Sequence, residues 1–170
     1  MQIPRELPEF KDKSTLLVVI GHHHGLFYSA SNGELEKIDD IKIEEPEHSD
    51  NEGLFKKGGS GDNYTFGSVL ESNKGKYEKE FSKSVAERVL DYSKNNDLDQ
   101  IYLFYPQEMK HYIEEDWNED MKKIITARFD GNYTKEHPTE IIKMIEEKRQ
   151  KDDVNEPTGE AKEILEKFDD

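Results

Sequence analysis

The first apolar pattern along the chain is the continuous run TLLVVIG, from Thr15 to Gly21. An uninterrupted run rich in β-branched residues predicts a strand that is buried on both faces. The following stretch, GLFYSASNGELEKIDDIKI, divides at Asn32-Gly33, a dipeptide that tolerates positive φ at both positions of a tight turn. This stretch predicts one strand on each side of the turn, so the three strands together predict an antiparallel meander.

The second half of the chain alternates helical and strand patterns. Apolar residues recur every four positions from Tyr77 to Val89, which is typical of an amphipathic helix. The patterns that follow predict a buried strand, a helix, a strand and a helix, over residues 99–106, 107–123, 123–131 and 137–150. Strands that alternate with helices predict parallel pairing with right-handed crossovers. The predicted fold class is therefore α/β, with a mixed sheet in which an N-terminal antiparallel meander is followed by α-β-α-β-α.

The domain organisation follows from these patterns. Residues 1–13 hold two prolines and predict an N-terminal arm, residues 14–150 predict the α/β domain, and residues 151–170 predict a polar linker and a short amphipathic C-terminal helix. Within the domain, residues 46–75 hold six glycines and little apolar periodicity. We interpret them as a long Gly-rich loop, and a loop of this length inside a compact domain is usually functional or disordered.

The composition excludes several classes of protein. The 170 residues suffice for one domain with a real core. There is no cysteine, which excludes disulfides and thiolate metal sites. The apolar runs are too short to span a bilayer, and the N-terminal residues lack the charged start and cleavage site of a signal peptide. We therefore expect a soluble, cytoplasmic protein without a membrane partner.

The net charge of −15 is distributed unevenly. An acidic chain is repelled by phosphate at long range, which disfavours DNA and general nucleic-acid binding. Between Leu54 and Lys94, however, eight basic residues face six acidic ones, so this segment carries +2 and the remainder carries −17. The region around the glycines is compatible with a contact to RNA. The acidic remainder is compatible with a basic protein partner.

Four stretches, in order along the chain, carry a family pattern: LLVVIGHHHGLFYSASNGELEKI, KKGGSGDNYTF, KYEKEFSKSVAERV and IYLFYPQEMKHYI. Together they resemble the middle domain of the eukaryotic and archaeal class-1 peptide-chain release factors. That domain is shared by Pelota-like ribosome-rescue factors and by stand-alone bacterial relatives labelled host attachment protein. The resemblance covers roughly residues 16–144 and implies the same mixed α/β fold.

The resemblance places KKGGSGDNYTF where the family has its basic Gly-Gly-Gln loop. In a release factor the glycines let the backbone approach the ester of peptidyl-tRNA, a backbone N–H can stabilise the oxyanion, and the glutamine admits water. Gly58 and Gly59 match this motif, but Ser60 stands at the glutamine position. Serine is too short to reproduce that reach, and the sequence shows no histidine partner that would make it a nucleophile. Independent catalysis is therefore not expected.

The sequence thus predicts a non-catalytic, translation-associated protein of the rescue or hibernation type, without a cofactor. Its expected partner is the ribosome, through ribosomal RNA or tRNA. The residues expected to make the contact are Lys56, Lys57, Gly58, Gly59, Ser60, Gly61, Lys74 and Lys76. Two alternatives remain open: a protein–protein interaction module of the host-attachment type with no ribosome role, and, more weakly, a peptidyl-tRNA hydrolase.

Three further groups have a structural interpretation and a chemical one. His22-His23-His24 is interpreted as a polar turn, with a metal site through His22 and His24 as the weak alternative. An acidic cluster is interpreted as a solvated helix face rather than a cation site, and comprises Glu114, Glu115, Asp116, Glu119 and Asp120. An aromatic set is interpreted as core and core edge, and comprises Tyr102, Phe104, Tyr105, Tyr112 and Trp117.

Overall fold

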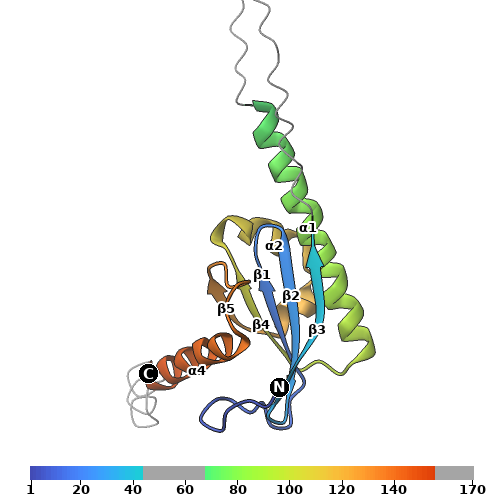
Figure 1. Cartoon of the computed structure of the whole chain (residues 1–170). Helices are drawn as coiled ribbons and strands as arrows, with labels where there is room; N and C mark the ends of the chain where they lie inside the picture. The colour runs from blue at the N-terminus through green and yellow to red at the C-terminus, as the bar shows by residue number, and fades with distance from the viewer. Residues whose placement is uncertain (44–67, 156–170) are drawn as a thin grey trace, which may run out of the picture.

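A computed structural model describes residues 1–43 and 68–155 of the chain. In this part of the chain five strands form one sheet: β1 (Thr15–Ile20), β2 (His24–Ser31), β3 (Glu34–Lys42), β4 (Gln100–Tyr105) and β5 (Ile125–Asp130). The helices are α1 (Ser68–Asn95), the 3-10 turn η1 (Gln107–Met109), α2 (Lys110–Asp116), α3 (Glu119–Lys123) and α4 (Pro138–Asn155). Figure 1 shows their arrangement.

The sheet has the strand order β3-β2-β1-β4-β5. β1 pairs antiparallel with β2, and β2 with β3, which confirms the predicted meander. β4 runs parallel to β1, and β5 runs parallel to β4, as the strand–helix alternation predicts. The turn between β2 and β3 has positive φ at both Asn32 (48°) and Gly33 (80°), as the dipeptide indicates. The mixed α/β fold class is confirmed.

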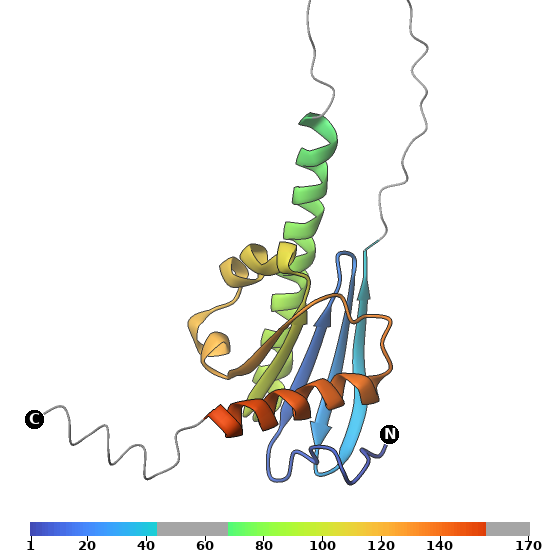
Figure 2. The same cartoon turned by 90° about the vertical axis from the view of Figure 1, so that its left-hand side faces the viewer.

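Both faces of β1 are buried, because its six side chains are all excluded from solvent. On one face, Leu16, Val18 and Ile20 pack in a cluster with α1 and with the segment from η1 to α3. On the other face, Leu17 and Val19 pack with α4 and with the N-terminal arm. Figures 1 and 2 show α1 and α4 on opposite sides of the sheet. The aromatic set is core and core edge as predicted, because four of its rings are buried and that of Tyr112 is partly buried.

The single polar side chain of β1 is satisfied at the start of the strand. Gln100 Nε2 donates a buried hydrogen bond of 2.7 Å to Thr15 Oγ1, and the two residues are register partners in the parallel pair β1–β4. One residue earlier, the Ser14 backbone N–H donates to Asp99 Oδ2 at 2.7 Å. These contacts fix the register at which β4 joins the meander.

α1 is much longer than the sheet that it covers. Its 28 residues span about 42 Å at 1.5 Å per residue. The six residues of β1 span about 20 Å at about 3.3 Å per residue. Among the side chains of α1 that the structure describes, from residue 75 onward, the buried ones run from Glu78 to Val89. Consequently the first turns of α1 extend beyond the edge of the sheet, which Figure 1 shows clearly.

Three predicted boundaries were wrong. Residues 68–75, expected in the Gly-rich loop, begin α1, because a helical glycine such as Gly75 costs only about 1 kcal/mol relative to alanine. The helix expected over 107–123 is divided, since Asn118 leaves the helical conformation and its side chain accepts a hydrogen bond from the Met121 backbone N–H at 2.8 Å. α4 continues to Asn155, through part of the expected linker. The expected C-terminal helix lies outside the described residues.

The N-terminal arm is integrated into the core. Ile3 and Phe10 are buried against the face that carries α4. The arm is also hydrogen-bonded to the β2–β3 turn: the Gly33 N–H donates to the Glu9 carbonyl at 2.6 Å, and the Asn32 N–H donates to the Phe10 carbonyl at 3.2 Å. The arm therefore contributes to the stability of the domain and does not merely precede it.

We predict that Phe10→Ala lowers the free energy of unfolding by about 3 kcal/mol, because it removes a buried aromatic ring and leaves a cavity. Chemical denaturation of the full chain measures this change. Glu6→Ala, at an exposed position of the same arm, is the matched control and should change stability by less than about 0.5 kcal/mol. Equal stability of both variants would contradict the packing of the arm.

Candidate functional site

Most of the features that the sequence singles out lie at one end of the strands of the sheet. There β1 ends at Ile20, β2 begins at His24 and β3 ends at Lys42. The Gly21 N–H donates to the His24 carbonyl at 2.7 Å, and the Ile43 N–H donates to the His23 carbonyl at 2.9 Å. We call residues 20–24 and 42–43 the distal edge. α1 extends past this edge, and residues 44–67 connect the end of β3 with the start of α1.

The predicted contact residues divide into two groups. Lys56, Lys57, Gly58, Gly59, Ser60 and Gly61 lie outside the described residues. Lys74 and Lys76 lie in the part of α1 that extends past the distal edge. The Lys76 side chain is exposed, with its Nζ 3.9 Å from Glu80 Oε1. Such an exposed pair contributes little to stability, so Lys76 is available for other contacts.

His22 and His23 lie in the turn between β1 and β2, as predicted, and His24 is the first residue of β2. His22 Nδ1 lies 3.3 Å from Glu78 Oε1 of α1, whereas His24 Nε2 lies 2.7 Å from Asp40 Oδ1 of β3. Each of these histidines therefore contacts a carboxylate on a different element. In residues 1–43 and 68–155, no group of three or more metal-ligating side chains is placed to hold an ion. The arrangement connects the turn to α1 and β3.

Glu78 is a site residue that the sequence reasoning missed. It is only 7% exposed, although it is a carboxylate. It precedes Phe81 and Ser82 by one helical turn, so its place on the apolar stripe of α1 was a usable signal. Its contact with His22 attaches the helix to the distal edge at the point where the helix leaves the sheet.

Further polar contacts fix α1 along its length. The Arg88 guanidinium Nε lies 3.2 Å from Asp39 Oδ2 of β3, and the Tyr92 hydroxyl donates to Ser29 Oγ of β2 at 3.0 Å. On the other side, Lys79 Nζ lies 3.1 Å from Glu115 of α2. Together with the apolar cluster, these contacts attach the part of α1 that covers the sheet to β2, β3 and α2.

The acidic cluster is largely the predicted solvated helix face. Glu115, Glu119 and Asp120 are exposed, and each pairs with one lysine. The exception is Asp116, which is half-buried and whose Oδ2 has no hydrogen-bond partner within the described part of the chain. The side chain of Glu114 lies outside the described atoms.

The comparisons with known proteins identify structural neighbours only. No protein-family model and no curated protein matches the chain. Among solved structures, it is similar to an archaeal protein at 8% identity, with a TM-score of 0.46, over 76% of this chain and 33% of that chain. It is also similar to the archaeal translation termination factor aRF1 at 6% identity, with a TM-score of 0.43, over 83% of this chain and 40% of that chain.

A third neighbour is Dom34 of S. cerevisiae, a translation termination-like factor involved in RNA quality control pathways and interacting with Hbs1. The identity is 14% and the TM-score 0.36, over 85% of this chain and 40% of that chain. The chain therefore spans a third to two fifths of the length of these proteins. No helix in the described ranges has both the length and the apolar composition needed to cross a bilayer.

The carboxylate at the distal edge leads to a pH-dependent prediction. The hydrogen bond from Lys37 lowers the pKa of Asp40, partial burial opposes this, and the contact with His24 lowers the pKa further. A lowered pKa in the folded state means that Asp40 stabilises the fold above its unfolded pKa, near 3.8, and that this contribution is lost as the pH falls through the folded value.

We predict that Asp40→Asn reduces the unfolding free energy at pH 7 by less than about 1 kcal/mol, because the pair is partly exposed and screened. The difference from the wild type should shrink as the pH falls below 3.8 and vanish below the lowered pKa of the folded state. Urea denaturation over a pH series measures it. Asp97→Asn, at an exposed position, serves as the control. A difference that persists unchanged in acid would contradict the ionic origin.

Proposed function

We propose that this protein binds the ribosome without catalysing a reaction, and that it presents residues 56–61 at the end of α1 as the contact. Two features support the proposal. The first is the resemblance of four stretches, in order, to the release-factor middle domain. The second, which carries the proposal, is that α1 extends well past the distal edge of the sheet, while its remaining turns pack against the sheet.

α1 is longer than a helix that only covers the sheet needs to be. A helix that only covered the sheet would need the roughly 12 to 14 residues that match a 20 Å strand. α1 has 28 residues, about twice that number, so it is longer than covering the sheet requires. In our proposal this extension carries the contact residues that precede α1 in the chain away from the sheet.

The charge distribution supports RNA as the chemical target. Lys56, Lys57, Lys74 and Lys76 lie in a region of the chain, residues 54–94, whose net charge is positive. Lysine contacts phosphate as a point charge, and such contacts weaken as salt displaces them. Acidic residues repel phosphate, so we expect these lysines, rather than the acidic parts of the chain, to make the contact with RNA.

We propose a non-catalytic role because Ser60 stands where the release-factor motif has glutamine. Its hydroxyl is shorter than a glutamine side chain and cannot place an amide beside the two glycines. The protein would therefore act by occupying a site, or together with a partner.

We predict that the purified protein co-sediments with ribosomes at low salt and that Lys56→Glu/Lys57→Glu abolishes this, because two phosphate contacts become repulsions. Binding by the wild type should weaken steeply with salt. The matched control is Lys122→Glu/Lys123→Glu, which makes the same charge change in α3, immediately before β5 and far from the distal edge. Equal loss of binding in both double variants would indicate a general charge effect and contradict the proposal.

The acidic surface favours a second candidate function, binding of a basic protein. In that case the wild-type protein would stay in the supernatant when ribosomes are pelleted, at every salt concentration.

We also predict that the protein does not release peptide from peptidyl-tRNA on isolated ribosomes, since the motif glutamine is replaced. Release is measured with a labelled peptide, and the Gly59→Ala variant is tested beside the wild type. Release by the wild type that Gly59→Ala loses would favour the hydrolase alternative instead.

A further inference from the structure

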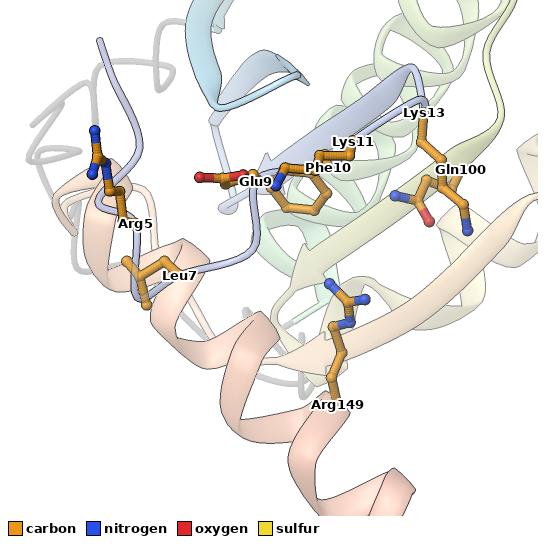
Figure 3. A pocket seen from close by; sticks show the side chains of 8 residues that line it. All are labelled: Arg5, Leu7, Glu9, Phe10, Lys11, Lys13, Gln100 and Arg149. Atoms are coloured by element: carbon orange, nitrogen blue, oxygen red, sulfur yellow. Dashed lines mark ion pairs between the residues drawn. The ribbon is translucent and has the colours of Figure 1, made fainter.

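A second candidate site lies at the opposite end of the strands, where β4 begins, between the N-terminal arm and α4. There the structure contains a pocket of about 440 Å³. Its lining comes from the arm, from the first residue of β4 and from α4, and comprises Arg5, Leu7, Glu9, Phe10, Lys11, Lys13, Gln100 and Arg149. Figure 3 shows these side chains around it. We call it the basal pocket.

The basal pocket is cationic in a chain whose net charge is −15. Four of its eight lining residues are basic and one is acidic. Glu9 is already engaged, because its Oε2 lies 2.7 Å from Lys11 Nζ, and this contact lowers the pKa of Glu9. Within the described part of the chain, Arg5, Lys13 and Arg149 form no ion pair with any carboxylate. Arg5 is nevertheless close enough to Glu9 to lower its pKa further, so among the described residues the basic side chains around the pocket outnumber the acidic ones.

Arg149 holds an unusual position on α4. It follows Ile141 and Ile145 at intervals of four residues, and both isoleucines are completely buried against the sheet. Arg149 therefore lies on the side of the helix that faces the sheet, and its side chain is exposed; Figure 3 shows the guanidinium extending toward Gln100. Burial raises the pKa of Tyr102 of β4, and the positive charge of Arg149 partly opposes this rise.

The arm contributes its lysines through a strained turn. Phe10 has φ of 49° and Asp12 has φ of 54°, a region that bulky non-glycine residues rarely adopt. The strain is held by hydrogen bonds from the β2–β3 turn to the Glu9 and Phe10 carbonyls. Strained backbone persists where the surrounding structure enforces it, and it clusters at ligand sites. Here the strained residues flank Lys11 and directly precede Lys13.

From this convergence we propose that the basal pocket binds a small, multiply charged phosphate compound. Four basic side chains and one acidic side chain around one pocket favour a compact ligand with more than one negative charge, and arginine and lysine are the side chains that proteins use to hold phosphate. The volume lies in the range of small-molecule sites. Because the pocket lies at the far edge of the sheet from α1's extension, this proposal stands independently of the proposed function.

The test is isothermal titration calorimetry of the full chain with inorganic pyrophosphate, at low salt and without divalent cations. We expect saturable binding that Arg149→Ala and Lys13→Ala each weaken at least tenfold. Lys151→Ala is the matched control, because Lys151 is an exposed cation on α4 that does not line the pocket. It should change the affinity less than twofold. No saturable binding, or an equal loss with Lys151→Ala, would overturn the proposal.

Further titrations separate phosphate recognition from general attraction of anions. Binding of ADP but not of adenosine supports recognition of phosphate, whereas binding of adenosine, or of citrate as tightly as pyrophosphate, contradicts it. Thermal unfolding of each variant checks that it is folded. Arg149→Lys provides a second variant that preserves the charge; it should bind more tightly than Arg149→Ala and less tightly than the wild type.

Discussion

The burial of β1 on both faces is the constraint on which the rest of the structure depends. The strand offers no side chain to solvent, and its one polar group, on Thr15, is satisfied by Gln100. Each face must therefore be covered completely. α1 and the segment from η1 to α3 cover one face, while α4 and the N-terminal arm cover the other. If either cover were removed, an uninterrupted apolar surface would be exposed to water, and the burial of such surface is the dominant favourable term in folding.

The elements that cover the two faces of the sheet also form the candidate sites at the two ends of the molecule. α1 exceeds the length needed to cover its face, so its first turns extend past the distal edge, and His22, Arg88 and Tyr92 mark the contacts that hold its base. On the other face, the arm and α4 meet over the start of β4 and enclose the basal pocket. One packing requirement thus positions an extended helix at one edge and a cationic cavity at the other.

Much of the fold was predictable from the sequence, because its signals are local. The apolar runs gave β1 and β4, and Asn32-Gly33 gave the hairpin between β2 and β3. The packing of the arm was not predictable, since Ile3 and Phe10 are isolated among prolines and charges and become core only through the sheet face that they meet. The same holds for the basal pocket: Arg149 and the arm are distant in sequence and only the fold unites them. Of the predicted contact residues, the helix positions 74 and 76 are described, and the residues from 56 to 61 remain a prediction from resemblance.

The central claim is that the segment before α1 meets RNA while the far edge of the sheet does not. Site-specific photo-crosslinking tests it most directly, with a photoreactive residue in place of Ser60 in one sample and in place of Lys123 in the other. The proposed function predicts crosslinks to ribosomal RNA from position 60 and none above background from position 123. Crosslinks of equal yield from both positions, or none from position 60, would contradict it.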